Sequence, residues 1–147
     1  MKELLYLKDD QLKGFVEKLF MGYRESFGDA KKILEKYSIG IAHHKVIHLL
    51  SIYEGITVSE LLKKLKVTKQ SLNRVLNDLI KLGTIKYEKD EIDTRVKHIY
   101  LTIEGKKLFE EIFSIQKKRI YNAFIGSESN EVVGFDKVLK KIINEKF

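Results

Sequence analysis

The sequence lacks cysteine and proline altogether. Without cysteine there are no disulfides, no thiolate metal sites and no regulation by thiol oxidation, and this composition fits a reducing cytoplasm. Without proline, no residue interrupts a long helix by ring clash. No run approaches the roughly 18 consecutive apolar residues of a membrane span, and the charged stretch 1–10 lacks the long apolar run of a secretory signal. We therefore expect a cytoplasmic protein with extended helices and no membrane segment.

Catalytic signatures are missing as well. The sequence contains no phosphate-cradling glycine loop, no Gly-x-Ser-x-Gly nucleophile turn and no His-Glu-x-x-His zinc motif. Its carboxylates are plentiful, but they fall on the polar faces of predicted helices. These absences argue against an enzyme, and nothing in the sequence indicates a cofactor.

Arginine is scarce, with four residues, so lysine supplies most of the positive charge. The formal net charge of +7 suggests an anionic partner. The excess is concentrated in residues 57–102, which hold ten lysines and arginines against six aspartates and glutamates. Arg74 and Arg95 both lie in this segment. Their planar guanidinium groups suit bidentate contact with phosphate or guanine in a way that lysine does not.

Apolar residues recur at steps of three and four along most of the chain, which predicts amphipathic helices. The predicted helices span about 10–26, 30–37, 42–53, 58–65, 69–82, 105–125 and 131–146. Two short strands, at 84–87 and 96–102, flank a charged loop and predict a β-hairpin. The expected fold class is therefore mainly α with a small β-hairpin wing.

The middle of the chain carries the signals of a helix-turn-helix. Thr57-Val-Ser-Glu60 is a capping box, whose hydroxyl and carboxylate can satisfy backbone N–H groups at a helix start. Thr68 is a second N-cap, just after a brief turn. Two short capped helices followed directly by a hairpin are typical of a winged helix. One stripe of the second helix is expected to face the core: Leu72, Val75, Leu76, Leu79 and Ile80.

The opposite face of that second helix is polar and suits DNA readout. Asparagine and glutamine can pair with adenine, arginine and lysine with guanine, and serine and threonine with phosphate or base. A solvated helix face is the alternative interpretation of the same pattern. The predicted contacts on and before this helix are Thr68, Lys69, Gln70, Ser71, Asn73 and Arg74.

Residues 56–105 resemble the MarR family of bacterial and archaeal regulators. Thr57-Val-Ser-Glu-Leu61 matches the start of that family's helix-turn-helix, and Thr68-Lys-Gln-Ser-Leu-Asn-Arg74 matches its recognition helix. Asp93-Thr-Arg95, followed by Leu101-Thr102 and then Glu104-Gly105, matches the family's wing signature. The motifs cover about a third of the chain.

The resemblance implies a transcriptional regulator that binds double-stranded DNA. By resemblance Arg95 would enter the minor groove, where a narrow A·T-rich groove attracts arginine, and Asp93 would brace Arg95 or its loop. Arg74 would contact the backbone or a major-groove edge. Lys89 and Lys97 supply further positive charge to the wing. A protein-binding winged helix is the main alternative function.

The terminal helices carry wide apolar stripes that a second copy of the chain would bury. By resemblance they form the family's dimer interface, and a two-fold homodimer would bind a pseudo-palindromic operator, as a repressor. A compact monomer core is the alternative. We expect a single domain, 1–147, with a DNA-binding part at 40–104 and a helical dimerisation part at 1–38 and 105–147.

Many relatives respond to a small anionic or phenolic effector. Tyr37, His43, His44 and Tyr53 are the residues that could line such a pocket here, although each also suits simple packing. His44 and His48 lie four residues apart, a spacing that can hold a metal. Because no carboxylate provides an evident third ligand, we predict no metal site, with a zinc-responsive regulator as the alternative.

Overall fold

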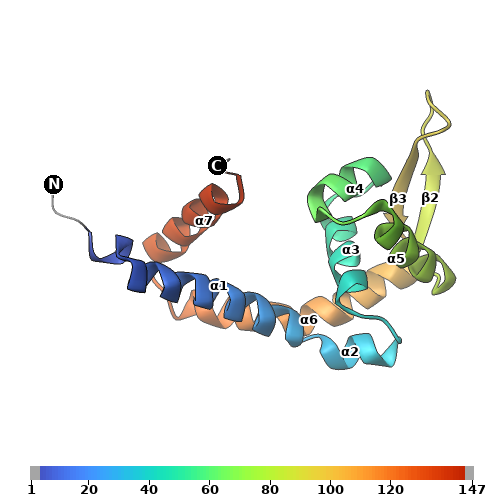
Figure 1. Cartoon of the computed structure of the whole chain (residues 1–147). Helices are drawn as coiled ribbons and strands as arrows, with labels where there is room; N and C mark the ends of the chain where they lie inside the picture. The colour runs from blue at the N-terminus through green and yellow to red at the C-terminus, as the bar shows by residue number, and fades with distance from the viewer. Residues whose placement is uncertain (1–3, 145–147) are drawn as a thin grey trace.

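The computed structural model describes residues 4–144, and it confirms a mainly helical fold with a small antiparallel sheet (Figure 1). The predicted helices and both predicted hairpin strands are present, with boundaries shifted by a few residues; the predicted end of the last helix, at 145–146, lies outside the described residues. The elements in chain order are η1 (Leu5–Leu7), α1 (Asp9–Gly28), α2 (Lys31–Lys36), α3 (Ile41–Ile52), β1 (Ile56–Thr57), α4 (Val58–Leu65), α5 (Lys69–Lys81), β2 (Ile85–Lys89), β3 (Lys97–Leu101), α6 (Ile103–Ile125) and α7 (Ser129–Asn144).

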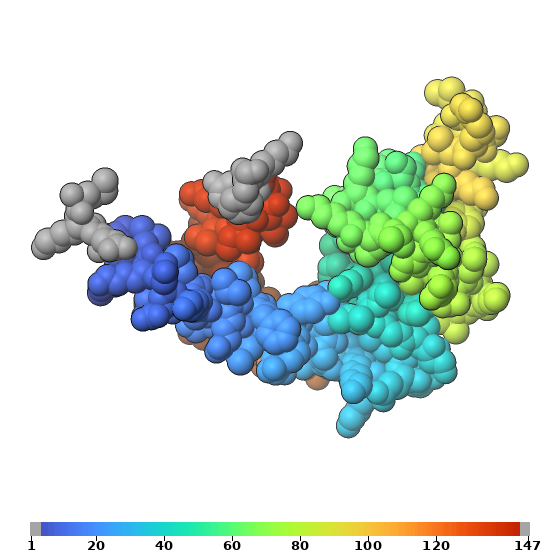
Figure 2. All heavy atoms as spheres, in the orientation of Figure 1, coloured from blue at the N-terminus to red at the C-terminus, as the bar shows by residue number. Residues whose placement is uncertain are grey.

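The elements form two parts that we call the head and the arm. The head, residues 41–112, holds α3, α4, α5, the sheet and the start of α6, whereas the arm, residues 4–28 and 115–144, holds η1, α1, α7 and the rest of α6. Figure 2 shows the head and α7 standing apart above the band formed by α1. The long helix α6 runs through both parts, and the segment 29–40 with α2 also joins them. No helix among residues 4–144 is long and apolar enough to cross a membrane.

Side-chain contacts fasten α1 and α2 to α6 at the junction of head and arm. Arg119 of α6 donates to both carboxylate oxygens of Asp29, at 2.6 and 2.8 Å. Tyr37 and Lys36 donate to the carboxylate of Glu111, at 2.9 and 3.2 Å. These contacts hold the pKa values of Asp29 and Glu111 below the usual range of a carboxyl group.

The sheet has the strand order β1-β3-β2, and all neighbours are antiparallel. The hairpin register runs from Ile85 opposite Leu101 to Lys89 opposite Lys97. Ile99 and Leu101 are buried, as the alternation predicts, and their face closes the core of the head. The sequence reasoning missed β1, because a two-residue strand has no period to detect and pairs with β3 only through the tertiary fold.

The core of the head is built from the apolar stripes of α3, α5 and α6 against the sheet. Leu72, Val75, Leu76 and Leu79 of α5 are buried, as predicted. Ile80 was predicted to join them, and this is wrong, because its side chain is 40% exposed. At about 100° of rotation per residue, Ile80 falls at the margin of the stripe, where the core covers it only in part.

Candidate nucleic-acid interface

Two threonine N-caps define where α4 and α5 begin. The Thr68 hydroxyl accepts a hydrogen bond from the backbone N–H of Ser71 at 3.1 Å, and Thr57 does the same for Glu60 at 3.2 Å. The Glu60 carboxylate accepts a hydrogen bond from the Thr57 hydroxyl at 3.1 Å. This differs from the predicted capping box, in which the carboxylate accepts from a backbone N–H. Lys66 ends α4 in the left-handed conformation, with a φ of 53°, and so forms the tight turn between the two helices.

The outward face of α5 carries the predicted polar side chains. Because Leu72, Leu76 and Leu79 anchor the opposite face, these residues are held exposed on the surface of the head. Among residues 4–144, none of the side chains of Lys69, Gln70, Asn73 and Arg74 forms a hydrogen bond or ion pair. The exposed set on and before α5 is Thr68, Lys69, Gln70, Ser71, Asn73 and Arg74.

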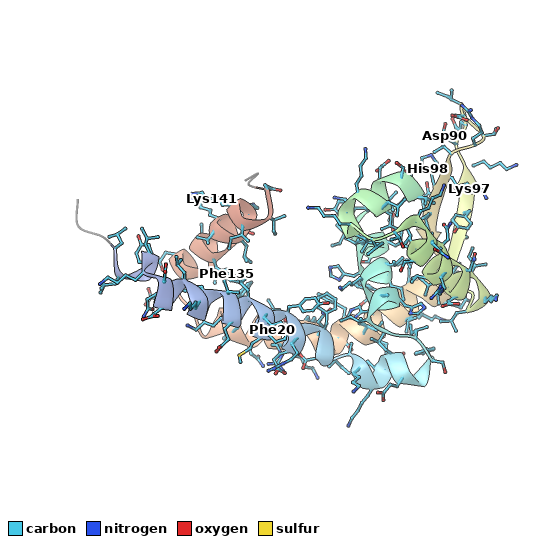
Figure 3. The ribbon with its side chains drawn as sticks, viewed as in Figure 1. Phe20, Asp90, Lys97, His98, Phe135 and Lys141 are labelled. Carbon is cyan, nitrogen blue, oxygen red and sulfur yellow. The ribbon has the colours of Figure 1, made fainter. Side chains whose placement is uncertain are left out.

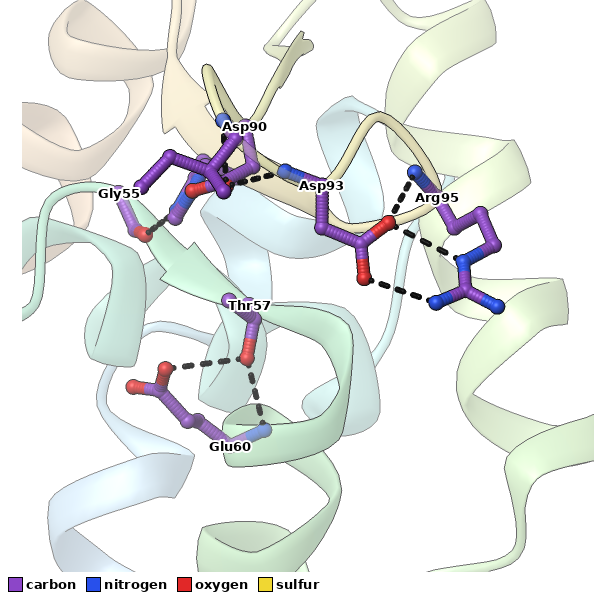
Figure 4. Close-up of polar contacts among 8 residues, drawn as sticks. Gly55, Thr57, Glu60, Asp90, Asp93 and Arg95 are labelled. Atoms are coloured by element: carbon purple, nitrogen blue, oxygen red, sulfur yellow. Dashed lines mark hydrogen bonds and ion pairs between the residues drawn. The ribbon is translucent and has the colours of Figure 1, made fainter.

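The loop between β2 and β3, residues 90–96, which we call the wing, presents Arg95 to solvent. The Arg95 side chain is 89% exposed. Its guanidinium donates from Nε and Nη2 to the two oxygens of Asp93, at 3.1 and 3.2 Å, and its backbone N–H donates to the same carboxylate at 3.0 Å (Figure 4). These bonds lower the pKa of Asp93. Exposed ion pairs contribute at most about 1 kcal/mol, so this pair orients the Arg95 side chain more than it stabilises the fold.

Asp90 organises the wing from its base. One of its oxygens, Oδ2, accepts from the backbone N–H groups of Ile92 and Asp93, at 3.1 and 2.9 Å. The other, Oδ1, lies 2.8 Å from Nε2 of His98 on β3. The backbone bond from Asp93 and the side-chain bond from His98 together lower the pKa of Asp90 to about 2. Sequence reasoning missed Asp90 and His98, because nothing local marks a contact between a loop and the strand after it.

Lys89 and Lys97 stand opposite each other at the base of the wing, as the ends of the hairpin register. Both are exposed, and the Lys97 ammonium lies 5.3 Å from the centre of the Tyr87 ring. Figure 3 shows Lys97, His98 and Asp90 together at this end of the head, far from Phe20 and Phe135 on the arm.

The four predicted pocket residues are not brought together. Tyr37 donates to Glu111. His43 accepts from the backbone N–H of Gly40 at 3.0 Å and its Nε2 lies 2.9 Å from Asp78. The Lys64 ammonium lies over the Tyr53 ring, 4.1 Å from the ring centre. His44 is fully buried, with its ring beside that of Phe27. None of the four lines the cavity between α1, α3 and α6, because spacing along the chain cannot say which helix faces of α2 and α3 converge.

A cavity of about 630 Å³ lies instead between α1, α3 and α6. Its walls are mostly aromatic and aliphatic, its floor includes His48 and Gln116, and its rim includes Lys117 and Tyr121. Behind the floor, His44 is fully buried with its ring centre 4.9 Å from that of Phe27. The apolar wall residues are Phe27, Phe113, Ile120, Phe124 and Ile125.

Buried polar atoms collect at the floor of this cavity. Both ring nitrogens of His44, Nδ1 of His48 and the amide oxygen of Gln116 have no hydrogen-bond partner among residues 4–144. Burial, reinforced by the neighbouring His48, lowers the pKa of His44 to about 4, and burial also lowers the pKa of His48. Both rings are therefore neutral near pH 7. No cluster of three or more metal-ligating side chains occurs among residues 4–144.

Comparison with known proteins places the chain in a family. A family model described as MarR family matches residues 37–95. The HTH-type transcriptional regulator PetP of Rhodobacter capsulatus is 38% identical over 141 residues, which are 96% of this chain and 85% of PetP. The chain belongs to the MarR family. It is accordingly a transcriptional regulator and not an enzyme.

Solved structures of the MarR family share the fold. NadR in complex with 4-hydroxyphenylacetate superposes with a TM-score of 0.78 at 20% identity, over 99% of this chain and all of that one. The Staphylococcus aureus MepR–DNA complex superposes with a TM-score of 0.70 at 24% identity, over 88% of this chain and 96% of that one. This MarR-family chain thus has the same overall fold as a protein whose structure was solved on DNA.

Proposed function

We propose that this MarR-family regulator binds double-stranded DNA through α5 and the wing. The observation that carries the proposal is the exposed polar face of α5, which has no partner among residues 4–144, beside a hairpin that ends in an exposed arginine. Lys69, Gln70, Asn73 and Arg74 would reach base edges in the major groove, and Arg95 would enter the minor groove. The MepR–DNA complex supports this assignment, because its fold is the same.

The remaining site residues hold the protein in register on the duplex. Thr68 and Ser71 lie at the N-terminus of α5, where backbone N–H groups favour phosphate oxygens. Lys89 and Lys97 lie beside the wing and would neutralise backbone phosphates. Asp93 would position Arg95 and would not touch DNA. Residues 40–104 are the DNA-binding part under this proposal, and 1–38 with 105–147 are the dimerisation part of one domain.

Homodimerisation is the second part of the proposal, and the arm is its interface. Large apolar side chains stand exposed along η1, α1 and α7, more than a soluble monomer usually leaves in contact with water. Val16 and Val138 are examples, at 67% and 56% exposed. A two-fold pairing of arms would bury these faces and present two copies of α5 to a pseudo-palindromic operator, where occupancy would repress transcription.

Charges introduced into the arm should therefore separate the two copies. We expect the wild-type chain to elute at twice its mass of 17.2 kDa and the Val16→Asp, Val138→Asp double variant to elute as a monomer. Each aspartate occurs twice in a symmetric interface, so the repulsion and the desolvation cost are doubled. Light scattering coupled to gel filtration measures the mass. The control is Ile52→Asp on the head, where the side chain is about as exposed as that of Val138. This variant should remain a dimer. Wild-type protein that elutes as a monomer would contradict the proposed interface.

We further infer that the cavity between α1, α3 and α6 binds a small aromatic acid that releases DNA. Aromatic walls, two polar side chains at the floor and a lysine at the rim suit a ligand with a ring, a hydroxyl and a carboxylate. The NadR complex with 4-hydroxyphenylacetate supports this ligand class. Because α6 lines the cavity and joins head to arm, a ligand there would change the spacing of two α5 helices, with a typical coupling of about 1–3 kcal/mol.

Ligand binding should raise the thermal stability of the protein and lower its affinity for DNA. We expect 4-hydroxyphenylacetate to raise the melting temperature, and Gln116→Leu to remove that shift, because the buried amide is lost from the cavity floor. Differential scanning fluorimetry measures the shift. The control is His43→Gln, a histidine outside the cavity, which should respond like the wild type. A shift retained in Gln116→Leu would place the ligand elsewhere.

A further inference from the structure

His98 lies between two groups that can only accept hydrogen bonds. Its Nδ1 is 2.7 Å from the backbone carbonyl oxygen of Gly55, in the turn before β1, and its Nε2 is 2.8 Å from Oδ1 of Asp90, at the base of the wing. A carbonyl oxygen never donates. The Asp90 carboxylate also accepts two backbone N–H groups, from Ile92 and Asp93, which is the pattern of an ionised carboxylate.

This geometry requires a proton on each ring nitrogen. Neutral imidazole has one N–H, so it can serve one of these two acceptors and must turn a lone pair toward the other. Only the imidazolium form satisfies both contacts. The ring is partly shielded, with 28% of its side chain exposed, so a lost contact is not simply replaced by water.

The contacts of His98 continue to the arginine at the tip of the wing. Asp90 accepts from the backbone N–H of Asp93, and the Asp93 carboxylate in turn holds Arg95. At the other end, Gly55 adjoins β1, whose Thr57 caps the first helix of the helix-turn-helix. Figure 4 shows this line of polar contacts from Gly55 through Asp90 and Asp93 to Arg95. The His98 side chain thus links the base of the wing to the turn before β1.

We propose that the His98 imidazolium is a latch that positions the wing and Arg95 for DNA, so that DNA affinity falls when His98 loses its proton. The proposal rests on the proposed function, because it specifies a positioning residue for the same interface. His98 is not itself a DNA contact here. Arg95 provides the contact, and His98 with Asp90 restricts where Arg95 can be.

The carboxylates and the carbonyl around His98 favour its charged form, and partial burial opposes it to a lesser degree. Asp90 faces it from the wing, Glu60 approaches from α4, and Glu88 stands opposite on β2. Thr57, opposite on β1, is neutral, and Lys97 points to the other face of β3. The hydrogen bond to Asp90, then that to Gly55, raises the pKa of His98 above its usual value. The stabilising contacts are therefore complete at low pH and are lost as the pH rises through this raised pKa.

The test combines a histidine titration in the free protein with DNA affinity at two pH values. NMR of the imidazole signals, assigned with His98→Gln, should show both ring nitrogens protonated at about pH 7 and a pKa above the ordinary value of about 6.5. DNA affinity of the wild type should fall severalfold between about pH 6 and about pH 8.5, as His98 loses its proton.

Two wing variants with the same charge change separate the latch from general electrostatics. Asp90→Asn keeps an acceptor for the backbone N–H groups and supplies an amide donor for neutral His98, so it should return the pKa of His98 toward 6.5 and flatten the pH dependence. Glu91→Gln alters the same loop without touching His98 and should keep the wild-type pH dependence, with any change in affinity equal at both pH values.

The outcomes distinguish the latch from the function on which it rests. A pKa for His98 at or below its ordinary value, or an unaltered pH dependence in Asp90→Asn, overturns the latch even if DNA binds well. A wild type that binds no DNA at any pH overturns the proposed function. In that case the latch is judged by hydrogen exchange of the wing amides, which should quicken with deprotonation in the wild type and not in Asp90→Asn; equal exchange in both would overturn it.

Discussion

Arg95→Ala should weaken DNA binding by about 1–3 kcal/mol, or roughly five- to 150-fold, and Arg74→Ala by a similar amount. Both side chains are exposed, and neither anchors the core. Their removal should therefore leave the free energy of unfolding within about 0.5 kcal/mol of the wild type. Each lost phosphate contact should also reduce the slope of log affinity against log salt by about 0.9. Gel shifts on the promoter upstream of the chain's own gene, repeated across salt concentrations, measure both quantities.

A cationic residue outside the proposed DNA interface provides the control for these two variants. Lys118→Ala removes an exposed charge from α6 in the arm and should change affinity little. Unchanged affinity in both Arg74→Ala and Arg95→Ala would overturn the site assignment. A flat salt dependence of the wild type would favour the other use of a winged helix, as a protein-binding module, because such binding releases no condensed counterions.

Gly105→Ala should destabilise the fold by about 1–3 kcal/mol or more, the cost typical of forcing extra atoms into a packed core. A Cβ at this position would lie 2.0 Å from the backbone oxygen of Thr84. That oxygen cannot easily retreat, because it accepts the backbone N–H of Thr102 at 2.9 Å. The Thr84 side chain is held as well, by a hydrogen bond from its hydroxyl to the carbonyl of Leu79 at 2.9 Å. Urea denaturation of the wild type and the variant measures the loss.

The matched substitution Gly14→Ala should have the opposite sign. Gly14 lies inside α1, and a Cβ there meets nothing within 4 Å. Alanine should thus stabilise the helix by about 0.5–1 kcal/mol, because the unfolded chain loses conformational freedom. If Gly105→Ala were as well tolerated as Gly14→Ala, the close approach of α6 to Thr84 would not exist in solution. Gly105 belongs to the wing signature read from the sequence, and this contact supplies a physical reason for its small size.

The local features of the head could be predicted because they depend on neighbours in the chain. The caps at Thr57 and Thr68 act on backbone groups three residues away. The stripe of α5 repeats with the helical period, and the strands of the hairpin follow one another directly. These signals were enough to name the polar residues of α5 and to place Arg95 in the loop of a hairpin, while its role in the minor groove came only from the resemblance to the MarR family.

Long-range features could not be predicted in the same way. His98 contacts Gly55, which lies 43 residues away, and no pattern in the sequence relates the two. No local pattern indicated the cavity, because Gln116 and Phe113 of α6 meet His48 of α3 only after both helices pack. Ile80 was assigned to the core by its period, yet the width of the packed face decides which residues at its margin are covered.

The sequence alone determined the order of the elements, their caps and the polar face of α5, because hydrogen bonds and helical periodicity act over a few residues. The tertiary structure decided which distant groups became neighbours: the cavity floor beneath α1, the close contact at Gly105 and the two acceptors around His98. Such neighbours follow from how whole helices and strands pack against each other. The free energy that selects one packing is a sum over the entire core, so no single position in the sequence encodes it.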